Sequence, residues 1–485
     1  MRKVKVRTLY LIAIIVGGLV GLATKSTYAM FTASAEIDNP ICMSANLTSE
    51  EETIETMEVV VTAGEKKIVP VTINNTSTNT VGYSVWYTSP SDEVEIGIKL
   101  SNSDSNNSTG TISSNGSKKV YVQIINNSSS SVTITLGVIS NKTSNDMTLV
   151  PNTELDFSVN LVTYIKNLYT NATKTTTTLD SVTYNLASSV GLMNDRFGSM
   201  STGIDAGNIR YYGANPNNYI YFNCSDYSNQ SSSTCETWRI IGIVDGMVKI
   251  MRNESIGSYS WDTSDYSIAS GTGFNEWSQA DLMKLLNSGY ESESVGGSLY
   301  WNADSGTCYN NRLNTTTTCD FSSIGLKNDT TRNMISETTY YTRGHNSNSI
   351  YVGAMYDKER VSGMVYSGNL TTWTGKVAIP YASDYGYAVD LSLCQKQLDS
   401  YNDETCTANN WIKNIVTNNG ANSGGLLTPN PSQTNFVWRT VPNGLVNYST
   451  GACVSVEVVP VFSLTSELGI RLGSGTSSDP YQLSI

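Results

Sequence analysis

The chain has little of what metal and catalytic sites usually need. It contains one His and 8 Cys in 485 residues, and its charged fraction is 15%, against about a quarter in typical globular domains. No H-E-x-x-H sequence and no C-x-x-C spacing occurs. A zinc peptidase and a cysteine–histidine zinc site are therefore not expected. We predict no metal, no cofactor and no enzymatic activity.

Two catalytic alternatives remain open. The single histidine, His345, could act as a base toward Cys453, because a nucleophile and its base need not be close in sequence. The 42 Asp and Glu residues could supply a carboxylate pair for glycoside hydrolysis, since spacing in sequence does not report separation in space. An unrelated histidine and solvated surface acids are the simpler interpretations.

Basic charge is also scarce, and phenylalanine is outnumbered by tyrosine. The net charge is −12, so a phosphate backbone would be repelled and nucleic acid is excluded as a partner. The chain has 29 Tyr and 8 Phe. Tyrosine buries its ring while its hydroxyl stays hydrated, which suits sugar- or protein-binding surfaces. Simple β propensity explains the same enrichment.

Residues 1–29 have the three parts of a secretory signal. Four basic residues precede an uncharged run from Leu9 to Ala23, and small residues up to Ala29 follow. The run is short for a membrane span of about 20 residues. We favour a signal peptide over an uncleaved anchor, which would be the one contact with a membrane. The predicted location is secreted or at the cell surface.

The end of this segment reads Thr27-Tyr28-Ala29-Met30-Phe31-Thr32. It resembles the signal region of camelysin-type and biofilm-matrix proteins of low-GC Gram-positive bacteria, in which a specialised signal peptidase cuts near a Tyr/Trp-Ala-x-Phe element. The resemblance implies an exported surface protein of such bacteria.

Six of the eight cysteines form three close pairs that enclose polar, turn-forming residues. Exported proteins meet oxidising conditions, so each pair predicts a local disulfide: Cys224–Cys235, Cys308–Cys319 and Cys394–Cys406. Closing a loop of this size stabilises by roughly 3 kcal/mol. Three states remain open for Cys42 and Cys453: a bond to each other, free thiols, or a bond to another chain.

Residues 36–160 predict an immunoglobulin-like β-sandwich. Two segments echo each other, 64–75 and 116–127; each has a glycine turn, a lysine pair, an apolar strand and an Asn-Asn exit. Residues 132–136 alternate apolar and polar side chains, as a strand with one hydrated face does. Several short strands separated by turns favour a sandwich.

Residues 161–205 read as a linker or transitional segment. Residues 164–169 could form a short helix, and the threonine-rich run 173–178 has the low complexity of a linker. The alternative is an exposed loop within the following domain.

Residues 206–485 predict an α+β domain with disulfide-tied loops. Asp245-Gly246 lies between two apolar runs, which is a strong hairpin signal. Ser278 and Asp281 could begin a helix that buries residues 282–286, and a second helix could begin near Asp329.

Several motifs in this half share one resemblance. They are Trp238-Arg239-Ile240-Ile241-Gly242, Tyr300-Trp301, Ser383-Asp384-Tyr385-Gly386-Tyr387-Ala388, Val437-Trp438-Arg439 and Gly473-Ser474-Gly475-Thr476-x-x-Asp479-Pro480-Tyr481. Together they resemble an uncharacterised domain of surface proteins from gut-associated Gram-positive bacteria, which looks like a relative of the C-type-lectin fold. The resemblance implies long loops that present a binding surface. It does not carry over calcium-lectin chemistry, because the Glu-Pro-Asn and Trp-Asn-Asp motifs are absent. The same branch of the fold includes formylglycine-generating domains. Their activity needs a late pair of reactive cysteines, and only Cys453 lies in that region.

Aromatic residues near turns give the candidate binding surface. Aromatic faces beside Asp or Asn suit carbohydrate and protein contacts, and the alternative is that the same rings fill the core. The candidates are Tyr300, Trp301, Asp304, Trp373, Tyr385 and Tyr387.

Three functions follow from these features. The first is an extracellular or cell-surface adhesion protein that presents a lectin-like head to a glycan or protein partner. The second is a structural biofilm or matrix component that assembles by strand addition. The third is an extracellular hydrolase.

Overall fold

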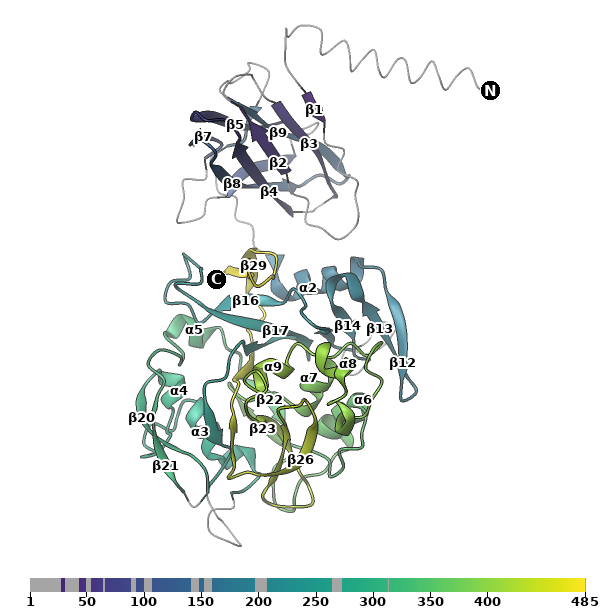
Figure 1. Ribbon diagram of the computed structural model, residues 1–485, viewed down its shortest axis with the longest axis vertical. Coiled ribbons are helices and arrows are strands. Elements are labelled where there is room, and N and C mark those ends of the chain that lie inside the picture. The colour runs from purple at the N-terminus through teal and green to yellow at the C-terminus, as the bar shows by residue number, and fades with distance from the viewer. Residues whose placement is uncertain are drawn as a thin grey trace, which may run out of the picture. The chain divides into compact units, whose positions relative to one another are not determined.

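The computed structural model describes residues 28–30, 43–48, 54–63, 66–88, 93–99, 107–140, 148–151, 159–196, 207–263, 273–312 and 314–484 (Figure 1). The chain divides into two compact units, Met1–Phe157 and Ser158–Ile485. Most of the predicted export signal, and Cys42, lie outside the described residues. Among the helices that the structure describes, none has the length and apolar character needed to span a bilayer.

The first unit is built from two β-sheets. One sheet has the strand order β1-β3-β9-β5-β10, with β7 also paired to β5, and the other has the order β2-β4-β8-β6. The strands are β1 (Tyr28–Met30), β2 (Met43–Leu47), β3 (Ile54–Val61), β4 (Lys66–Asn75), β5 (Val81–Thr88), β6 (Val94–Lys99), β7 (Thr109–Ile112), β8 (Ser117–Asn126), β9 (Val132–Ser140) and β10 (Thr148–Leu149).

Alternation of side chains explains why the two sheets share one core. In β9, Val132, Ile134 and Leu136 are buried while Thr133 is exposed. Strands of both sheets contribute such apolar side chains to a single hydrophobic cluster. The β-rich prediction for this region is confirmed, and the immunoglobulin-like classification stays a prediction.

The two echoing segments form neighbouring antiparallel strands, β4 and β8. At the end of each strand, an asparagine side chain bonds to nearby backbone groups in the same way. The Asn75 side chain donates to the carbonyl oxygens of Asn79, Ile112 and Ser113 and accepts from Ser77. The Asn126 side chain makes the equivalent set of bonds at the end of β8. The repeat in the sequence therefore reflects a buried asparagine at the end of each strand, whose side chain forms hydrogen bonds with backbone groups of the following turn.

The second unit contains a large sheet with the strand order β12-β13-β14-β15-β17-β18-β28, and β16 also pairs with β17. Its strands are β12 (Thr175–Leu179), β13 (Val182–Ala187), β14 (Leu192–Asn194), β15 (Ile209–Tyr211), β16 (Tyr219–Phe222), β17 (Glu236–Val244), β18 (Met247–Arg252) and β28 (Val461–Ser463).

This sheet corrects the predicted linker. Residues 161–194 fold as helix α2 (Leu161–Asn171) and strands β12 to β14, all within the second unit. Threonine is β-branched and favours strands, and in β12 Thr177 and Leu179 are buried while their neighbours are exposed. A low-complexity threonine run can thus be an edge strand, because its alternate side chains still reach a core.

The remaining strands form a second sheet, a three-stranded sheet and two hairpins. The second sheet has the order β19-β27-β24-β25-β26, from β19 (Ser258–Ser260), β24 (Gly424–Pro429), β25 (Phe436–Thr440), β26 (Val446–Gly451) and β27 (Ser455–Glu457). The others are β11 (Val159–Asn160), β29 (Gly469–Leu472), β30 (Gln482–Ser484), β20 (Ser305–Tyr309), β21 (Thr316–Asp320), β22 (Thr338–Tyr341) and β23 (Thr372–Gly375). Because β11 pairs with β29, the beginning and end of the unit lie side by side.

The described helices of this unit that follow α2 are short. They are α3 (Asp281–Leu286), α4 (Leu299–Asn302), α5 (Asp329–Asn333), α6 (Val352–Asp357), α7 (Ala382–Tyr387), α8 (Glu404–Ala408) and α9 (Lys413–Val416). Single turns are η1 (Ser188–Val190), η2 (Trp277–Gln279), η3 (Lys358–Ser362) and η4 (Leu398–Ser400). The helices predicted near Asp281 and Asp329 are confirmed, although α3 has no side-chain cap and α5 is capped by Asn328.

The hairpin β17–β18 also follows the prediction. Asp245 and Gly246 both have positive φ, as a two-residue turn of this kind requires. Gly242 sits at a bulge in β17, where an added Cβ would lie 2.1 Å from the carbonyl oxygen of Ile209. Only glycine lets β15 approach β17 this closely.

A buried ion cluster joins this sheet to helix α7. Asp384 of α7 accepts from Arg210 of β15 at 2.9 Å and from Lys249 of β18 at 2.5 Å, and Arg210 also contacts Asp195 at 2.6 Å. All four side chains are buried. Burial alone would raise the pKa of Asp384, but the charges of Lys249, Arg210 and Arg360 outweigh it and hold this pKa well below its ordinary value.

We predict that Asp384→Asn lowers the free energy of unfolding by about 3–5 kcal/mol at pH 7, because it leaves two buried cations short of a partner. The folded-state pKa of Asp384 is lowered. The stabilisation is therefore complete above the unfolded value of about 3.9 and is lost as the pH falls. Urea denaturation at pH 7 and pH 3 should show a smaller difference between wild type and variant at pH 3.

Asp329→Asn is the matched control, because Asp329 pairs with Arg332 at 2.8 Å but its side chain is 92% exposed. This substitution should cost less than about 1 kcal/mol. Equal costs for the two variants, or a cost of Asp384→Asn that does not change with pH, would contradict the assignment.

Candidate functional site

The predicted aromatic surface does not exist as one face. Tyr300 and Trp301 on α4 are buried in one core cluster, and Tyr385 and Tyr387 on α7 are buried in another. The prediction that these four rings form an exposed binding surface is wrong. Short helices turn the rings inward, and turn-forming neighbours in the sequence gave no information about that direction.

The two other predicted residues remain closer to the surface. Trp373 in β23 is half-buried, and its ring packs against Tyr340 at 5.5 Å and Trp277 at 6.1 Å between ring centroids. Asp304 is exposed just after α4. Neither residue lines the pocket described below.

The predicted disulfides are confirmed in all three pairs, Cys224–Cys235, Cys308–Cys319 and Cys394–Cys406. Cys453 is a buried free thiol, and its burial raises its pKa. The charges that act on this thiol come from Arg312 and Asp262. Burial likewise lowers the pKa of His345. In the described part of the chain, no group of three or more His, Cys, Asp or Glu side chains is placed to hold a metal ion.

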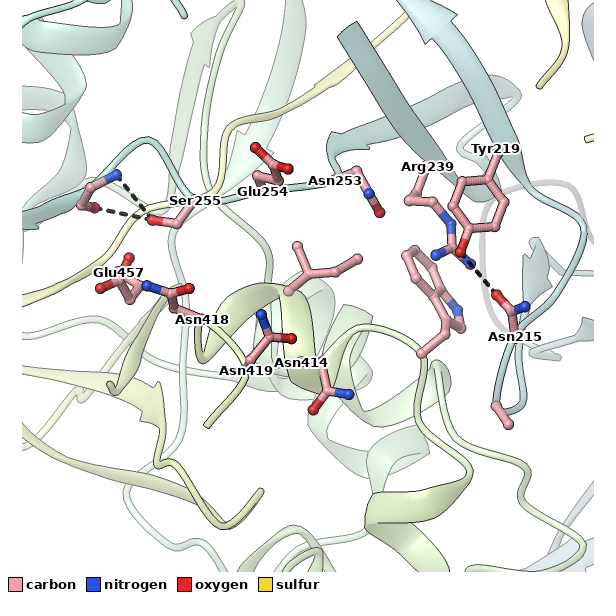
Figure 2. Close-up of a pocket in the computed structure, with 14 residues that line it drawn as sticks. Asn215, Tyr219, Arg239, Asn253, Glu254, Ser255, Asn414, Asn418, Asn419 and Glu457 are labelled. Atoms are coloured by element: carbon pink, nitrogen blue, oxygen red, sulfur yellow. Dashed lines mark hydrogen bonds between the residues drawn. The ribbon is translucent and has the colours of Figure 1, made fainter. Parts of the chain in front are cut away.

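A pocket of ≈ 650 Å³ lies within the second unit (Figure 2). It is lined by the residues around β16, by β17, by the segment after β18, by α9 with its exit, and by β27. Most of the lining is polar, and asparagine is the commonest residue type: Asn215, Asn253, Asn414, Asn418 and Asn419.

The end of α9 presents part of this polar lining. Asn418 and Asn419 have φ values of 47° and 55°, and Gly420 follows with 83°. Asparagine tolerates this left-handed conformation better than other residues with a Cβ, so the sequence Asn-Asn-Gly reverses the chain directly after the helix. Both asparagine side chains lie at the exposed rim of the pocket.

Arg239 forms the cationic part of the pocket (Figure 2). Its guanidinium carbon lies 3.6 Å from the centroid of the Tyr219 ring and 4.8 Å from that of the Trp411 ring. Its Nε donates to the Asn218 side chain at 2.6 Å. Burial lowers the pKa of Arg239 to about 10, so the side chain stays charged at neutral pH.

Arg239 differs from the other buried arginines in its partners. Arg210, Arg252 and Arg360 each pair with a carboxylate within 3.2 Å. Within the described ranges, no carboxylate lies within 4.0 Å of Arg239, which is 4% exposed. A buried cation without an anion is unfavourable, and such groups cluster at functional sites.

Carboxylates lie at a different part of the pocket. Figure 2 shows Glu457 and Ser255 at the side away from Arg239 and Tyr219, with Glu254 between them and Asn253. Glu254 is exposed, whereas Glu457 is buried and accepts from Ser258 at 2.8 Å and from Asn422 at 2.6 Å. The pocket therefore has opposite charges on two sides and neutral amides around them.

The sequence contained a signal for Arg239 that its motif concealed. The segment Trp238-Arg239-Ile240-Ile241-Gly242 carries part of the family resemblance, and it also contains a charged residue inside a buried strand. Trp238 and Ile240 belong to one core cluster and Ile241 to the other, so β17 is buried on both faces. A charged residue inside such a strand is rare unless it is paired or functional.

Comparisons with known proteins assign no family. No family model and no curated protein matches the chain. Among solved structures, it is similar to PliG of Aeromonas hydrophila and PliG of Salmonella Typhimurium, periplasmic inhibitors of g-type lysozyme. Identity is 10% and 8%, and TM-scores are 0.14 and 0.13. The alignments cover 21% and 20% of this chain and 98% of each inhibitor. At these TM-scores the likeness carries no argument about fold or function.

The unpaired state of Arg239 leads to a stability prediction. Arg252→Gln should lower the free energy of unfolding by about 3–5 kcal/mol, because it leaves the mostly buried Glu236 without its cation. Arg239→Gln should cost only about 1–2 kcal/mol. The variant loses two ring contacts and leaves the Asn218 acceptor unpaired, but it also removes a desolvated cation, and no carboxylate loses its partner. Chemical denaturation of the two variants checks the order. A larger cost for Arg239→Gln would mean that this arginine is retained for stability.

Proposed function

We propose that this chain is an exported binding protein whose second unit holds an extracellular saccharide in the pocket around Arg239. Three disulfides fit a protein that works in an oxidising compartment. The location at the cell surface or in the medium, and the role in adhesion, belong to this proposal. So do the immunoglobulin-like and lectin-like classifications of the two units.

The observation that carries the proposal is the set of unpaired amides in the pocket. The side chains of Asn253, Asn414 and Asn418 make no hydrogen bond to the residues that the structure describes. Each amide offers two donors and an acceptor with two lone pairs, which match the hydroxyl groups of a sugar. The pocket volume of ≈ 650 Å³ lies in the range of small-ligand sites, about 300–1,000 Å³.

A second function is favoured by one observation. Glu254 and Glu457 line the same pocket, and glycoside hydrolysis uses two carboxylates on either side of the scissile bond. Glu457 is already held by Ser258 and Asn422, which favours a structural role for it. Release of reducing ends from a bound oligosaccharide, abolished by Glu254→Gln, would establish the hydrolase instead.

We predict that the purified, oxidised chain binds saccharides on a glycan array. The double substitution Asn253→Ala and Asn414→Ala should weaken binding by roughly 10-fold or more, because each lost hydrogen bond contributes about 0.5–1.5 kcal/mol. Neither residue has a positive φ, and neither side chain is hydrogen-bonded to the described residues, so the variant should fold normally, and its thermal unfolding midpoint checks this.

Asp304→Ala is the control, because Asp304 is exposed and lies outside the pocket, and it should leave binding unchanged. Binding that is lost with Asp304→Ala and kept in the double asparagine variant would move the site away from the pocket. A folded chain that binds no saccharide would refute the proposed function.

A further inference from the structure

The guanidinium of Arg239 is held in place before any ligand arrives. The rings of Tyr219 and Trp411 both pack against it, and Nε donates to Asn218. Trp411 is itself fixed, because its indole nitrogen donates to the carbonyl oxygen of Tyr211 at 3.0 Å. A cation held this firmly loses little conformational freedom on binding.

Only the Nη edge of the guanidinium remains for a ligand. Nη2 makes one long contact, 3.4 Å, to the carbonyl oxygen of Pro216. Nη1 has no acceptor among the described residues, and it is not one of the enclosed polar atoms that lack a partner. Arginine binds planar carboxylates through two parallel N–H bonds along such an edge. The geometry therefore fits an acceptor in the plane of the guanidinium.

Charge limits how many anionic groups the ligand can carry. Glu254 and Glu457 line the pocket away from Arg239 (Figure 2), and the chain as a whole carries a net charge of −12. A second anionic group would meet these carboxylates and be repelled, whereas neutral hydroxyl groups can donate to them. A polyanion is disfavoured for the same reason.

We infer that the ligand is a saccharide with a single carboxylate, such as a terminal uronic or sialic acid, and that Arg239 binds this carboxylate. The inference rests on the saccharide-binding function proposed above. It makes Arg239 the residue that determines specificity for acidic over neutral sugars, while the asparagine amides bind the hydroxyl groups common to both.

The test compares acids with their own alcohols. Calorimetric titration of the whole chain would use sialyllactose and a glucuronic-acid-terminated oligosaccharide. It would also use the same two sugars with the carboxyl group reduced to an alcohol. We expect the acids to bind roughly 10- to 100-fold more tightly, since hydrogen bonds to charged groups contribute more than neutral ones. Arg239→Gln should remove this preference by weakening the binding of the acids far more than that of the alcohols. Asp304→Asn, which changes an exposed carboxylate outside the pocket, is the control and should retain the preference.

The outcomes separate this inference from the proposed function. Equal binding of acids and alcohols by the wild-type chain would overturn the inference and leave saccharide binding intact. Tighter binding of heparin, a sulfated polyanion, than of either acid would also overturn it. If no sugar binds, both proposals fail. Should Arg239→Gln not fold, the comparison of acid and alcohol on the wild-type chain still decides.

Discussion

Asp384 is buried between two cations, Arg210 and Lys249, and this contact holds helix α7 against the large sheet of the second unit. Arg210 and Lys249 belong to β15 and β18, and β17 lies between those strands in the sheet. Asp384 thus fixes helix α7 against the strands that flank the one carrying Arg239. Breaking a buried ion pair is costly because a desolvated charge remains, so the contact fixes the position of α7 as well as adding stability.

The position of the pocket follows from α7. At the end of this helix, Gly213 donates to the carbonyl oxygen of Ala388, and the Asn410 side chain donates to that of Tyr385. Gly213 comes directly before the pocket residues Ala214 and Asn215, and Asn410 directly before Trp411. The ion cluster is therefore connected, through hydrogen bonds to two carbonyl groups at the end of α7, to both segments that enclose Arg239. Asp384 and Tyr385 therefore stabilise the fold and do not line the pocket.

The two kinds of buried charge have different meanings. In the ion cluster, Asp195 and Asp384 balance Arg210 and Lys249, and no charge is left for a ligand. Arg239 is equally buried but is balanced only by neutral groups and aromatic faces. Cation–π contacts contribute about 2 kcal/mol when desolvated, which makes its burial tolerable without an anion. The pocket thus contains one buried cation without an anionic partner, Arg239, while Glu254 and Glu457 make the rest of its lining acidic.

Local sequence signals predicted local structure well. Asp245-Gly246 predicted its hairpin, and closely spaced cysteines predicted the three disulfides, because both depend on residues only a few positions apart. The direction of a side chain in a short helix depends on distant partners, so the burial of Tyr385 and Tyr387 was not predictable. The pocket was missed for the same reason, since β17 and α9 supply it from positions about 170 residues apart. The threonine run was predicted to be a linker but forms strand β12. The composition of a segment does not show that a distant or following strand, here β13, pairs with it.

The most direct measurement of the central claim is a crystal structure of the chain soaked in sialyllactose. The account predicts the sugar in the pocket, with its carboxylate about 2.7–2.9 Å from the Nη atoms of Arg239 and its hydroxyl groups on the asparagine amides. Sugar density beside Trp373 and Asp304, or a carboxylate that points away from Arg239, would contradict it.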